Sequence, residues 1–575
     1  MKISDYIAWF LQQKGVSHVF ELSGGMITHL LDSISQSTSI RIVTMHHEQS
    51  AAFAADAFGR VTGIPGVALA TSGPGATNLL TGIASCYFDS SPAVFITGQV
   101  NRHEQKGARE IRQLGFQETD IVSMAKPVTK ACFKIESAEE VPDVFEKAFA
   151  IAREGRPGPV LIDIPMDVQR FNLEVDKESL PMQQQDAADC DAGILEDLSL
   201  DLSNSKRPLL LIGRGVSAAF ARKELSSFID ITNIPVVTTL LGIDVIPFDH
   251  PQRVGFIGSY GNRWANIALG ECDLLIVAGS RLDIRQTGAD TAFFANRKIY
   301  HIDCENGEIN NRVKGCVPIV KDVKNFLASF NKKYHSKQYK IEVNWLEHIQ
   351  SLKSKWPDTE ELKEAKGINP NKFMHQVSRA SSSAGAFVVD VGAHQMWAAQ
   401  SLEINNDQLF LTSGGMGAMG FALPASIGAC LALNESPVVV IVGDGCMQIN
   451  IQELQTVVRN KLAVKIIVMN NRNLGMIRQF QDSYFESRHQ STYWGYSAPD
   501  FEKVAVAYGI IAKTISEEKE IDAAMQWMWS EENKEQPALL QVMIDPYTNT
   551  YPKIAFGKPL TEMEPFAKPM EMEGT

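Results

Sequence analysis

Short runs of apolar, largely β-branched residues recur along this chain, and each is followed by a longer segment with helical spacing. In the first part of the chain these runs lie at 18–22, 41–45, 66–71, 93–98 and 159–164. Strands that alternate with helices pair through crossovers instead of hairpins, so this rhythm predicts parallel sheets flanked by helices. We therefore expect an α/β fold.

The rhythm fades twice, which divides the 575 residues into three blocks of similar size. A chain of this length predicts three or four domains, at about 150 residues each. We expect an N-terminal domain over 1–170, a central domain over 190–335 and a third domain over 360–545. The tail over 546–575 has no sheet pattern and should lie on the surface.

Composition narrows the classes of function. Acidic residues outnumber basic ones by 67 to 54, whereas proteins that bind nucleic acid or acidic membranes usually carry a basic surplus. The eight cysteines form no CxxC pair, which is typical of reduced thiols. The N-terminal segment lacks the apolar core of a signal peptide, and no apolar run is long enough to span a bilayer. We expect a cytoplasmic protein that binds neither nucleic acid nor membrane.

A Gly-Asp-Gly triplet at 443–445 is followed, one helix and one strand later, by Asn471. Both Asp444 and Asn471 come directly after apolar runs, so a right-handed βαβ unit would place them at the same edge of a sheet. Carboxylate and amide oxygens are ligands that suit Mg²⁺ bound to a diphosphate, and a backbone carbonyl of Asn473 could join them. The triplet alone would indicate only a turn. Its spacing to the asparagine predicts a metal–diphosphate site.

This pairing is the thiamine-diphosphate motif, and the chain resembles the acetohydroxyacid (acetolactate) synthase group of thiamine-diphosphate enzymes from about residue 1 to residue 545. The resemblance implies a pyrimidine-binding domain, a central FAD-binding-like domain and a diphosphate-binding domain. It also implies thiamine diphosphate, Mg²⁺ and FAD as cofactors. A homodimer or homotetramer, with each active site between two chains, is implied as well.

Glu48 opens an alanine-rich helix after a strand, in the segment HEQSAAFAADAFGR. By itself it would be a first-turn glutamate that the helix dipole favours. The resemblance implies that it is the catalytic carboxyl group, which hydrogen-bonds the coenzyme's pyrimidine and exchanges a proton with it. Phe116 and Gln117 match a substrate-facing pair and complete the catalytic set. Coenzyme contacts are implied for Gly24, Gly25, Gly73 and Asn78.

In the third block, the resemblance implies that the coenzyme is held by Gly392, His394, Gln395, Gly415, Met416, Met419, Gly445, Cys446, Gly475 and Met476. Met419 would be the apolar wedge that bends the coenzyme, although an ordinary core methionine is the alternative. The glycines at 415–420 also match a nicotinamide fingerprint. No strand-terminating acidic residue follows at the required distance, which argues against a dinucleotide there.

The central block carries glycine, arginine and aspartate residues near expected strand ends. Guanidinium groups suit a pyrophosphate, and an aspartate after a strand suits a ribose. A vestigial domain is the alternative from these residues alone. The resemblance implies that FAD is held by Gly213, Arg214, Gly215, Gly279, Arg281, Arg285, Asp303 and Asp322.

The substrate region departs from the family pattern at one aromatic position. Arg285 and Met476 match substrate-facing residues, but Phe480 stands where relatives that favour 2-ketobutyrate have tryptophan. The smaller ring should grip an additional methyl group less well.

A second departure is the loop between Val100 and Phe116, which is several residues longer than in those synthases and carries Arg109 and Arg112. It is either a solvated loop or a basic lid over the site, and a basic lid would favour an acceptor with phosphate groups.

The expected function is decarboxylation of pyruvate and transfer of the two-carbon unit to a carbonyl acceptor, with a second pyruvate giving acetolactate. One alternative is a carboligase that acts on a nucleotide-linked keto sugar. A pyruvate oxidase-like flavoenzyme is the other. The sequence makes no prediction about a regulatory subunit.

Overall fold

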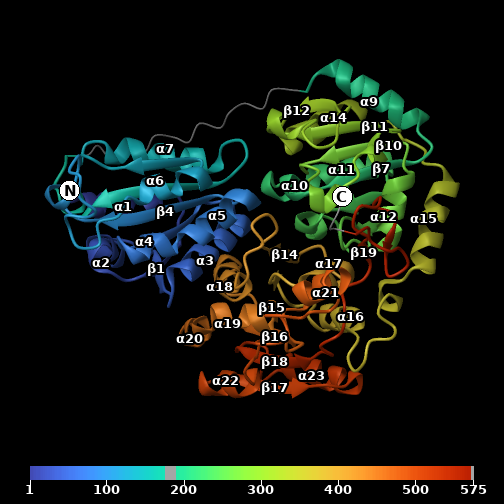
Figure 1. The fold of residues 1–575 in the computed structure, drawn as a ribbon. Helices are drawn as coiled ribbons and strands as arrows, with labels where there is room; N and C mark the ends of the chain where they lie inside the picture. Colours follow the sequence, from blue (N-terminus) through green and yellow to red (C-terminus); the bar gives the residue numbers. More distant parts are fainter. Residues whose placement is uncertain (175–189, 572–575) are drawn as a thin grey trace.

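A computed structural model describes residues 1–174 and 190–571 of the chain. These residues form three six-stranded sheets whose strands all run parallel, and the tail adds one antiparallel pair, β19 (Lys553–Ile554) and β20 (Met563–Glu564). Figure 1 shows the three sheets as separate layered blocks, with helices packed over them. The α/β prediction is therefore confirmed. No described helix is both long and apolar enough to cross a bilayer.

The N-terminal sheet has the strand order β2-β1-β3-β4-β6-β5. Its strands are β1 (His18–Leu22), β2 (Arg41–Thr44), β3 (Gly66–Ala70), β4 (Ala93–Gln99), β5 (Ala131–Lys134) and β6 (Pro159–Pro165). Its helices are α1 (Ile3–Gln13), α2 (Thr28–Ser37), α3 (Glu48–Thr62), α4 (Pro74–Asn78), α5 (Leu80–Asp89), α6 (Ile121–Ala125), α7 (Val141–Arg153) and α8 (Met166–Gln169).

The third sheet, β14-β13-β15-β16-β18-β17, repeats this order when its strands are counted from β13. Its strands are β13 (Ala386–Val389), β14 (Leu409–Thr412), β15 (Val438–Gly443), β16 (Val464–Asn470), β17 (Ile511–Ile515) and β18 (Ala538–Met543). Its helices are α16 (Pro370–Ala380), α17 (Ala393–Ser401), α18 (Ala422–Ala432), α19 (Asp444–Ile449), α20 (Leu454–Arg459), α21 (Gly475–Tyr484), α22 (Phe501–Ala507) and α23 (Ile521–Met528). Both sheets thus have a switch point between their first and third strands, where α/β folds bind ligands.

The central sheet has a different order, β12-β11-β10-β7-β8-β9, which is the doubly wound order of dinucleotide-binding folds. Its strands are β7 (Pro208–Ile212), β8 (Val236–Thr238), β9 (Arg253–Phe256), β10 (Leu274–Ala278), β11 (Lys298–Asp303) and β12 (Val317–Val320). Its helices are α9 (Ala192–Asn204), α10 (Arg214–Ala218), α11 (Arg222–Thr232), α12 (Arg263–Glu271), α13 (Ile284–Thr287), α14 (Val323–Tyr334) and α15 (Val343–Lys355). The switch point lies between β7 and β10.

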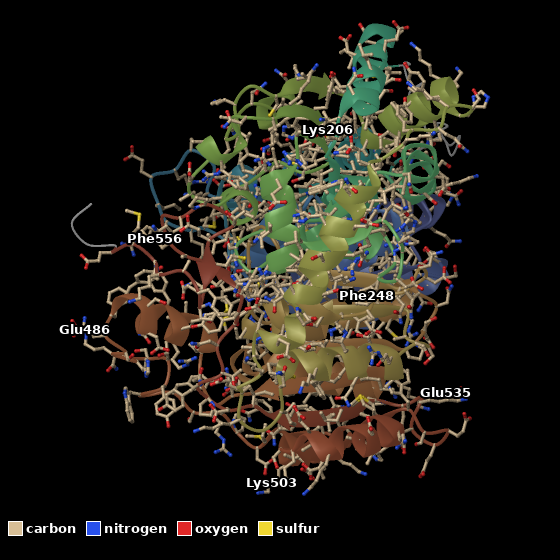
Figure 2. The ribbon with its side chains drawn as sticks, turned by 90° about the vertical axis from the view of Figure 1, so that its right-hand side faces the viewer. Lys206, Phe248, Glu486, Lys503, Glu535 and Phe556 are labelled. Atoms are coloured by element: carbon tan, nitrogen blue, oxygen red, sulfur yellow. The ribbon has the colours of Figure 1, made fainter. Side chains whose placement is uncertain are left out.

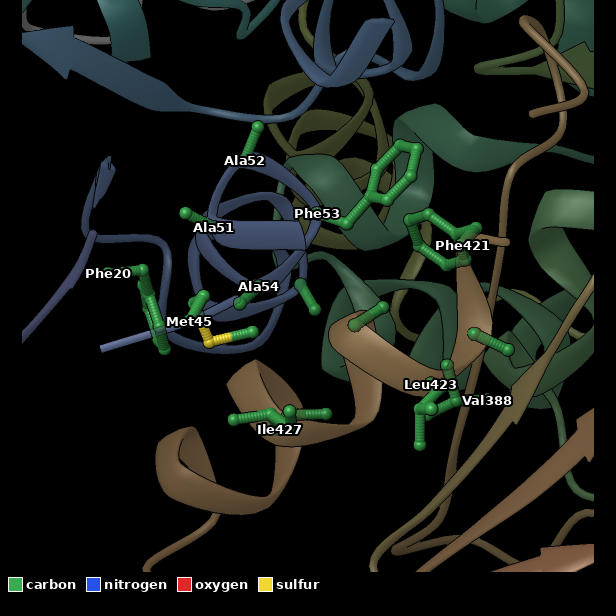
Figure 3. Packing of buried hydrophobic residues seen from close by; sticks show 14 of the residues in the cluster. Phe20, Met45, Ala51, Ala52, Phe53, Ala54, Val388, Phe421, Leu423 and Ile427 are labelled. Atoms are coloured by element: carbon green, nitrogen blue, oxygen red, sulfur yellow. The ribbon is translucent and has the colours of Figure 1, made fainter. Parts of the chain in front are cut away.

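Helices α3 and α18 join the first and third domains through one hydrophobic core (Figure 3). The rings of Phe53 and Phe421 meet edge to face, with centroids 5.4 Å apart. A Cβ atom on Gly428 would lie 2.0 Å from the carbonyl oxygen of Ala54, so only glycine permits this close approach. The packing fixes the start of α3, where Glu48 lies, relative to the third domain.

The contact between the central and third domains includes Phe248, which lies at their boundary (Figure 2). Its backbone N–H donates a 2.9 Å hydrogen bond to the carbonyl oxygen of Ile404. Its ring centroid lies 4.9 Å from the Arg253 guanidinium carbon and 6.0 Å from the imidazole centroid of His375. The ring contact with His375 and the main-chain hydrogen bond therefore cross this boundary, while Arg253 holds the Phe248 ring by a cation–π contact from within the central domain.

Contrary to the surface position expected from its sequence, much of the tail is buried. Leu560 and Met563 join the core of the central domain. Arg263 on α12 donates hydrogen bonds to the carbonyl oxygens of Met563 (3.1 Å) and Glu564 (3.0 Å). The apolar residues of the tail are too widely spaced to form a strand or helix pattern, but burial against a preformed domain needs only a few anchors.

Candidate active site

A cavity of about 590 Å³ lies beside the residues that follow β13, β15 and β16 at the edge of the third sheet. Most of the coenzyme and substrate residues proposed for the third block line it. They are Gly392, His394, Gln395, Met419, Gly445, Cys446, Gly475, Met476 and Phe480, together with Arg285 from the central domain and the proposed metal ligands Asp444, Asn471 and Asn473.

The three proposed metal ligands fit a divalent cation. Asp444 is only 2% exposed, and burial raises the pKa of its carboxyl group to about 7. Asn471 Oδ1 accepts a 3.2 Å hydrogen bond from the N–H of Asn473, while the buried Oδ1 of Asn473 has no hydrogen-bond partner in the described part of the chain. The Asp444 carboxylate and the Asn471 amide oxygen are hard donors of the kind that Mg²⁺ requires, and the unpartnered side-chain oxygen of Asn473 is a further donor besides the backbone carbonyl expected from the sequence.

His394 lies beside these ligands as a neutral imidazole. Its Nε2 accepts a 3.2 Å hydrogen bond from the N–H of Gly443, so the ring proton is on Nδ1. Burial lowers the pKa of His394 to about 3. Through this hydrogen bond, His394 orients the end of β15. Because its imidazole carries no charge, a cation would have to balance the charge of a bound phosphate.

Asp390, which the sequence analysis missed, holds the end of the glycine loop at 413–420. Its carboxylate accepts hydrogen bonds from the N–H groups of Gly420 (2.9 Å) and Ala422 (2.8 Å). Burial raises the pKa of this carboxyl group. Asp390 follows β13 directly, but nothing in the sequence links a strand-end aspartate to a loop more than twenty residues away.

A second cavity, of about 160 Å³, lies at the switch point of the central sheet. It is lined by the proposed FAD residues Arg214, Gly215, Gly279, Arg281, Arg285, Asp303 and Asp322, while Gly213 precedes them at the end of β7. Gly415 is proposed to contact the coenzyme, but it lines this second cavity and not the one that contains Asp444. Met416 is 43% exposed and lines neither. Arg285 lines both cavities.

The second cavity fits a dinucleotide. Burial lowers the pKa of Arg214 to about 10, and its buried Nε has no hydrogen-bond partner within the described residues. A cation of this kind suits a pyrophosphate. Gly279 has a φ of +64°, and a Cβ atom there would lie 2.6 Å from the Cα of Gly215, so the two turns touch. Because neither glycine has a side chain, their backbone remains open to a ligand in the cavity that both residues line.

The proposed residues of the N-terminal domain form a third cluster. Asn78 Nδ2 donates a 2.9 Å hydrogen bond to Oε2 of Glu48, which is 6% exposed at the start of α3. Gly73 lies against Gln117, since a Cβ atom on Gly73 would be 2.9 Å from the Cβ of Gln117. Gly24 lies against the side chain of Thr71, and Gly25 follows it. Phe116 directly precedes Gln117 and is 80% exposed.

Within one chain, the Glu48 cluster lies outside the cavity that contains Asp444. None of the described N-terminal residues lines the cavity that contains Asp444. After the roles that the sequence resemblance implies for them, we call the Glu48 cluster (Gly24, Gly73, Asn78, Gln117) the pyrimidine half-site and the Asp444 cavity the diphosphate half-site. Arg109 and Arg112 are exposed on the loop that leads to Gln117.

Three family models match the chain in succession. They describe the N-terminal thiamine pyrophosphate-binding domain (1–124), the central domain (196–330) and the C-terminal thiamine pyrophosphate-binding domain (390–542) of thiamine pyrophosphate enzymes. The chain belongs to this family of thiamine pyrophosphate (thiamine diphosphate) enzymes.

Within the family, the chain is similar to acetolactate synthases along almost its whole length. It is 37% identical to the "Probable acetolactate synthase large subunit" of Methanocaldococcus jannaschii, over 98% of this chain and 95% of that one. It is 37% identical to the chloroplastic acetolactate synthase 2 of Nicotiana tabacum, over 97% and 84%. It is 36% identical to the acetolactate synthase isozyme 1 large subunit of Escherichia coli (strain K12), over 97% of both chains.

Proposed function

We propose that the chain decarboxylates pyruvate and transfers the two-carbon unit to a carbonyl acceptor, and that a second pyruvate gives acetolactate. The observation that carries the proposal is the cavity that brings Asp444, Asn471 and Arg285 together while Glu48 lies outside it. Two chains in a homodimer, or a homotetramer built from such dimers, would complete each site. The names of the relatives support the reaction, and the term "large subunit" supports an oligomeric assembly.

The proposal assigns roles to residues in both half-sites. Asp444, Asn471 and Asn473 would hold Mg²⁺, and bound thiamine diphosphate would supply the electron sink for decarboxylation. Glu48 Oε2 is oriented by Asn78 and would exchange a proton with the pyrimidine. The Arg285 side chain makes no hydrogen bond or ion pair within the described residues, so it is available to bind a keto-acid carboxylate.

FAD belongs to the proposal through the second cavity. The unpaired Nε of Arg214 and the close turns at Gly215 and Gly279 support a pyrophosphate there. Because Arg285 lines both cavities, a flavin would lie next to the substrate region. A flavin in that position could also accept electrons from the substrate, so oxygen uptake with formation of acetate would favour an oxidase-like activity over carboligation.

An acceptor with phosphate groups, such as a nucleotide-linked keto sugar, is the second candidate. It is supported by the loop that precedes Gln117. The Glu118 carboxylate accepts hydrogen bonds from the N–H groups of Lys106 (2.6 Å) and Leu114 (2.8 Å) and so closes the loop. Arg109 and Arg112 are exposed on this closed loop, where phosphate oxygens could reach them. Arg109 Nη1 also donates 3.2 Å hydrogen bonds to the carbonyl oxygens of Gln105 and Lys106.

Product analysis tests the reaction. The protein is incubated with thiamine diphosphate, Mg²⁺, FAD and ¹³C-labelled pyruvate, with or without a nucleotide-linked keto sugar, and the products are identified by mass spectrometry. Labelled acetolactate is the expected product, and a labelled branched sugar would support the second candidate. Neutralising both Arg109 and Arg112 should then weaken only the phosphorylated acceptor. Absence of any carboligation product would refute the proposal.

Subunit complementation tests the shared site. Glu48→Gln and Asp444→Asn chains are each expected to be nearly inactive, but each retains one intact half-site. Co-expressed chains should recover about a quarter of wild-type activity, because half of the dimers would be mixed and each would hold one intact site. No recovery, with mixed dimers verified by mass spectrometry, would contradict a site shared between chains.

A further inference from the structure

The proposed metal ligand Asp444 has a side-chain partner outside the motif that identifies it. The hydroxyl of Tyr496 donates a 3.1 Å hydrogen bond to Asp444 Oδ2. Tyr496 belongs to the segment between α21 and α22, and α20, β16 and α21 lie between it and the helix that Asp444 begins. Neither the GDG triplet nor the asparagines at 470–471 point to this tyrosine.

The surroundings fix the direction of this hydrogen bond. Gln448 Nε2 donates to the Tyr496 hydroxyl oxygen (3.4 Å) and also to the backbone oxygen of Asp444 (3.3 Å). Since the hydroxyl accepts from Gln448, its own proton is free for the carboxylate. A Cβ atom on Gly445 would lie 3.4 Å from both the Tyr496 hydroxyl and the Met419 methyl carbon, so the hydroxyl is next to the wall of the diphosphate half-site.

The segment that carries Tyr496 is anchored at one end and exposed beyond it. The carbonyl oxygen of Thr492 accepts a 3.0 Å hydrogen bond from the N–H of Leu474, and His489 Nε2 lies 2.6 Å from Asp482 Oδ1. After Thr492 the chain is largely exposed, with Trp494 at 62%. Tyr496 therefore reaches back to Asp444 from an exposed stretch, 493–500.

We propose that Tyr496 is a positioning residue of the cation site, which orients the Asp444 carboxylate and ties the stretch 493–500 to that site. Carboxylates that bind metals are themselves held by hydrogen bonds, and loss of such a partner typically costs 10–100-fold in metal affinity. Coupling between the two is reciprocal, so a bound cation should also stabilise the stretch 493–500. This inference rests on the proposed function, which assigns the cation to Asp444.

The test compares Tyr496→Phe with Tyr493→Phe. Tyr493 lies in the same segment and packs against Trp494 and Tyr547, but its hydroxyl makes no hydrogen bond within the described residues. Binding of Mn²⁺, as a probe for Mg²⁺, is measured by electron paramagnetic resonance with saturating thiamine diphosphate. We expect Tyr496→Phe to weaken Mn²⁺ binding at least tenfold and Tyr493→Phe to change it less than twofold.

Hydrogen exchange of the backbone amides over 493–500 is the second readout. If Tyr496 had only a structural role, the exchange rate of this stretch would not depend on the cation. Mg²⁺ with coenzyme should slow exchange over 493–500 in the wild type but not in Tyr496→Phe. If the wild type binds Mn²⁺ and the affinity of Tyr496→Phe is within twofold of the wild-type affinity, or higher, this inference alone is overturned. Failure of the wild type to bind Mn²⁺ overturns the proposed function together with it.

Discussion

Asp89 accepts a 2.6 Å hydrogen bond from the backbone N–H of Gly415, 326 residues further along the chain. The same carboxylate accepts a 3.0 Å bond from the N–H of Gly414 and pairs with the guanidinium of Arg60. Arg60 in turn donates to the carbonyl oxygen of Thr412 at 2.8 Å. A buried charge network thus fixes the glycine loop of the third domain to α3 and α5 of the first.

Asp89→Asn should destabilise the protein and weaken binding of FAD. The variant leaves the buried Arg60 paired with Asp56 alone, so the loss should be smaller than the cost of leaving a buried charge unpaired, which is about 3–5 kcal/mol. Gly414 and Gly415 line the second cavity, so their displacement should also weaken flavin binding. Urea unfolding and titration of flavin fluorescence measure both effects. The exposed Asp407→Asn is the control, and equal stability of the two variants would contradict the structural role of Asp89.

Glu48→Gln should lower carboligation turnover at least about tenfold to a hundredfold, as expected for loss of a proton-transfer group. The amide can still meet Asn78, so the fold should be preserved. Steady-state acetolactate formation is measured, with circular dichroism as a check on folding and the exposed Glu110→Gln as a control. Turnover within twofold of the wild type would rule out the assigned role.

Phe480→Trp should shift acceptor choice toward 2-ketobutyrate over pyruvate by roughly tenfold, because one more methyl group in an apolar contact discriminates to about this degree. The Phe480 ring lines the cavity and packs at 4.8 Å against Tyr484, so a larger ring would extend this aromatic wall. Competition between both keto acids, read as a product ratio, measures the change. Phe485→Trp is the control, since Phe485 lies on the same aromatic cluster but does not line the cavity.

His375 should make stability depend on pH. It lies 2.8 Å from both Asp358 Oδ2 and Glu403 Oε1. Burial would lower its pKa, but the hydrogen bonds and charges of these carboxylates prevail and raise it. Charged His375 therefore stabilises the fold below about pH 6.5, the pKa of an unfolded histidine, and this contribution is lost as pH rises through the raised pKa.

The matching experiment compares the wild type with His375→Gln. At pH 6 the variant should be less stable by about 1.5–3 kcal/mol, the contribution of a hydrogen bond to a charged group, and the gap should narrow toward pH 9. Urea unfolding midpoints at both pH values measure it. The exposed His335→Gln should show no such gap. A gap that is equal at pH 6 and pH 9 would show that the charge of His375 contributes nothing.

Much of the fold was predictable because local signals and tertiary position agree. Apolar runs marked the strands, and parallel pairing then brought Asp444 and Asn471 to one sheet edge. Arg214 and Gly279 were likewise predicted to lie near strand ends, and both line the cavity at the central switch point.

By itself, the sequence determined the α/β class, three parallel sheets and which motif residues stand at strand ends, because strand periodicity and glycine turns act over a few residues. Only the tertiary structure decided that Asp89 and Asp390 hold the glycine loop, that Tyr496 meets Asp444, and that the tail is buried. It also decided that Glu48 lies outside the cavity that contains Asp444. These relationships depend on how domains pack, and packing between distant segments leaves no periodic trace in a single sequence.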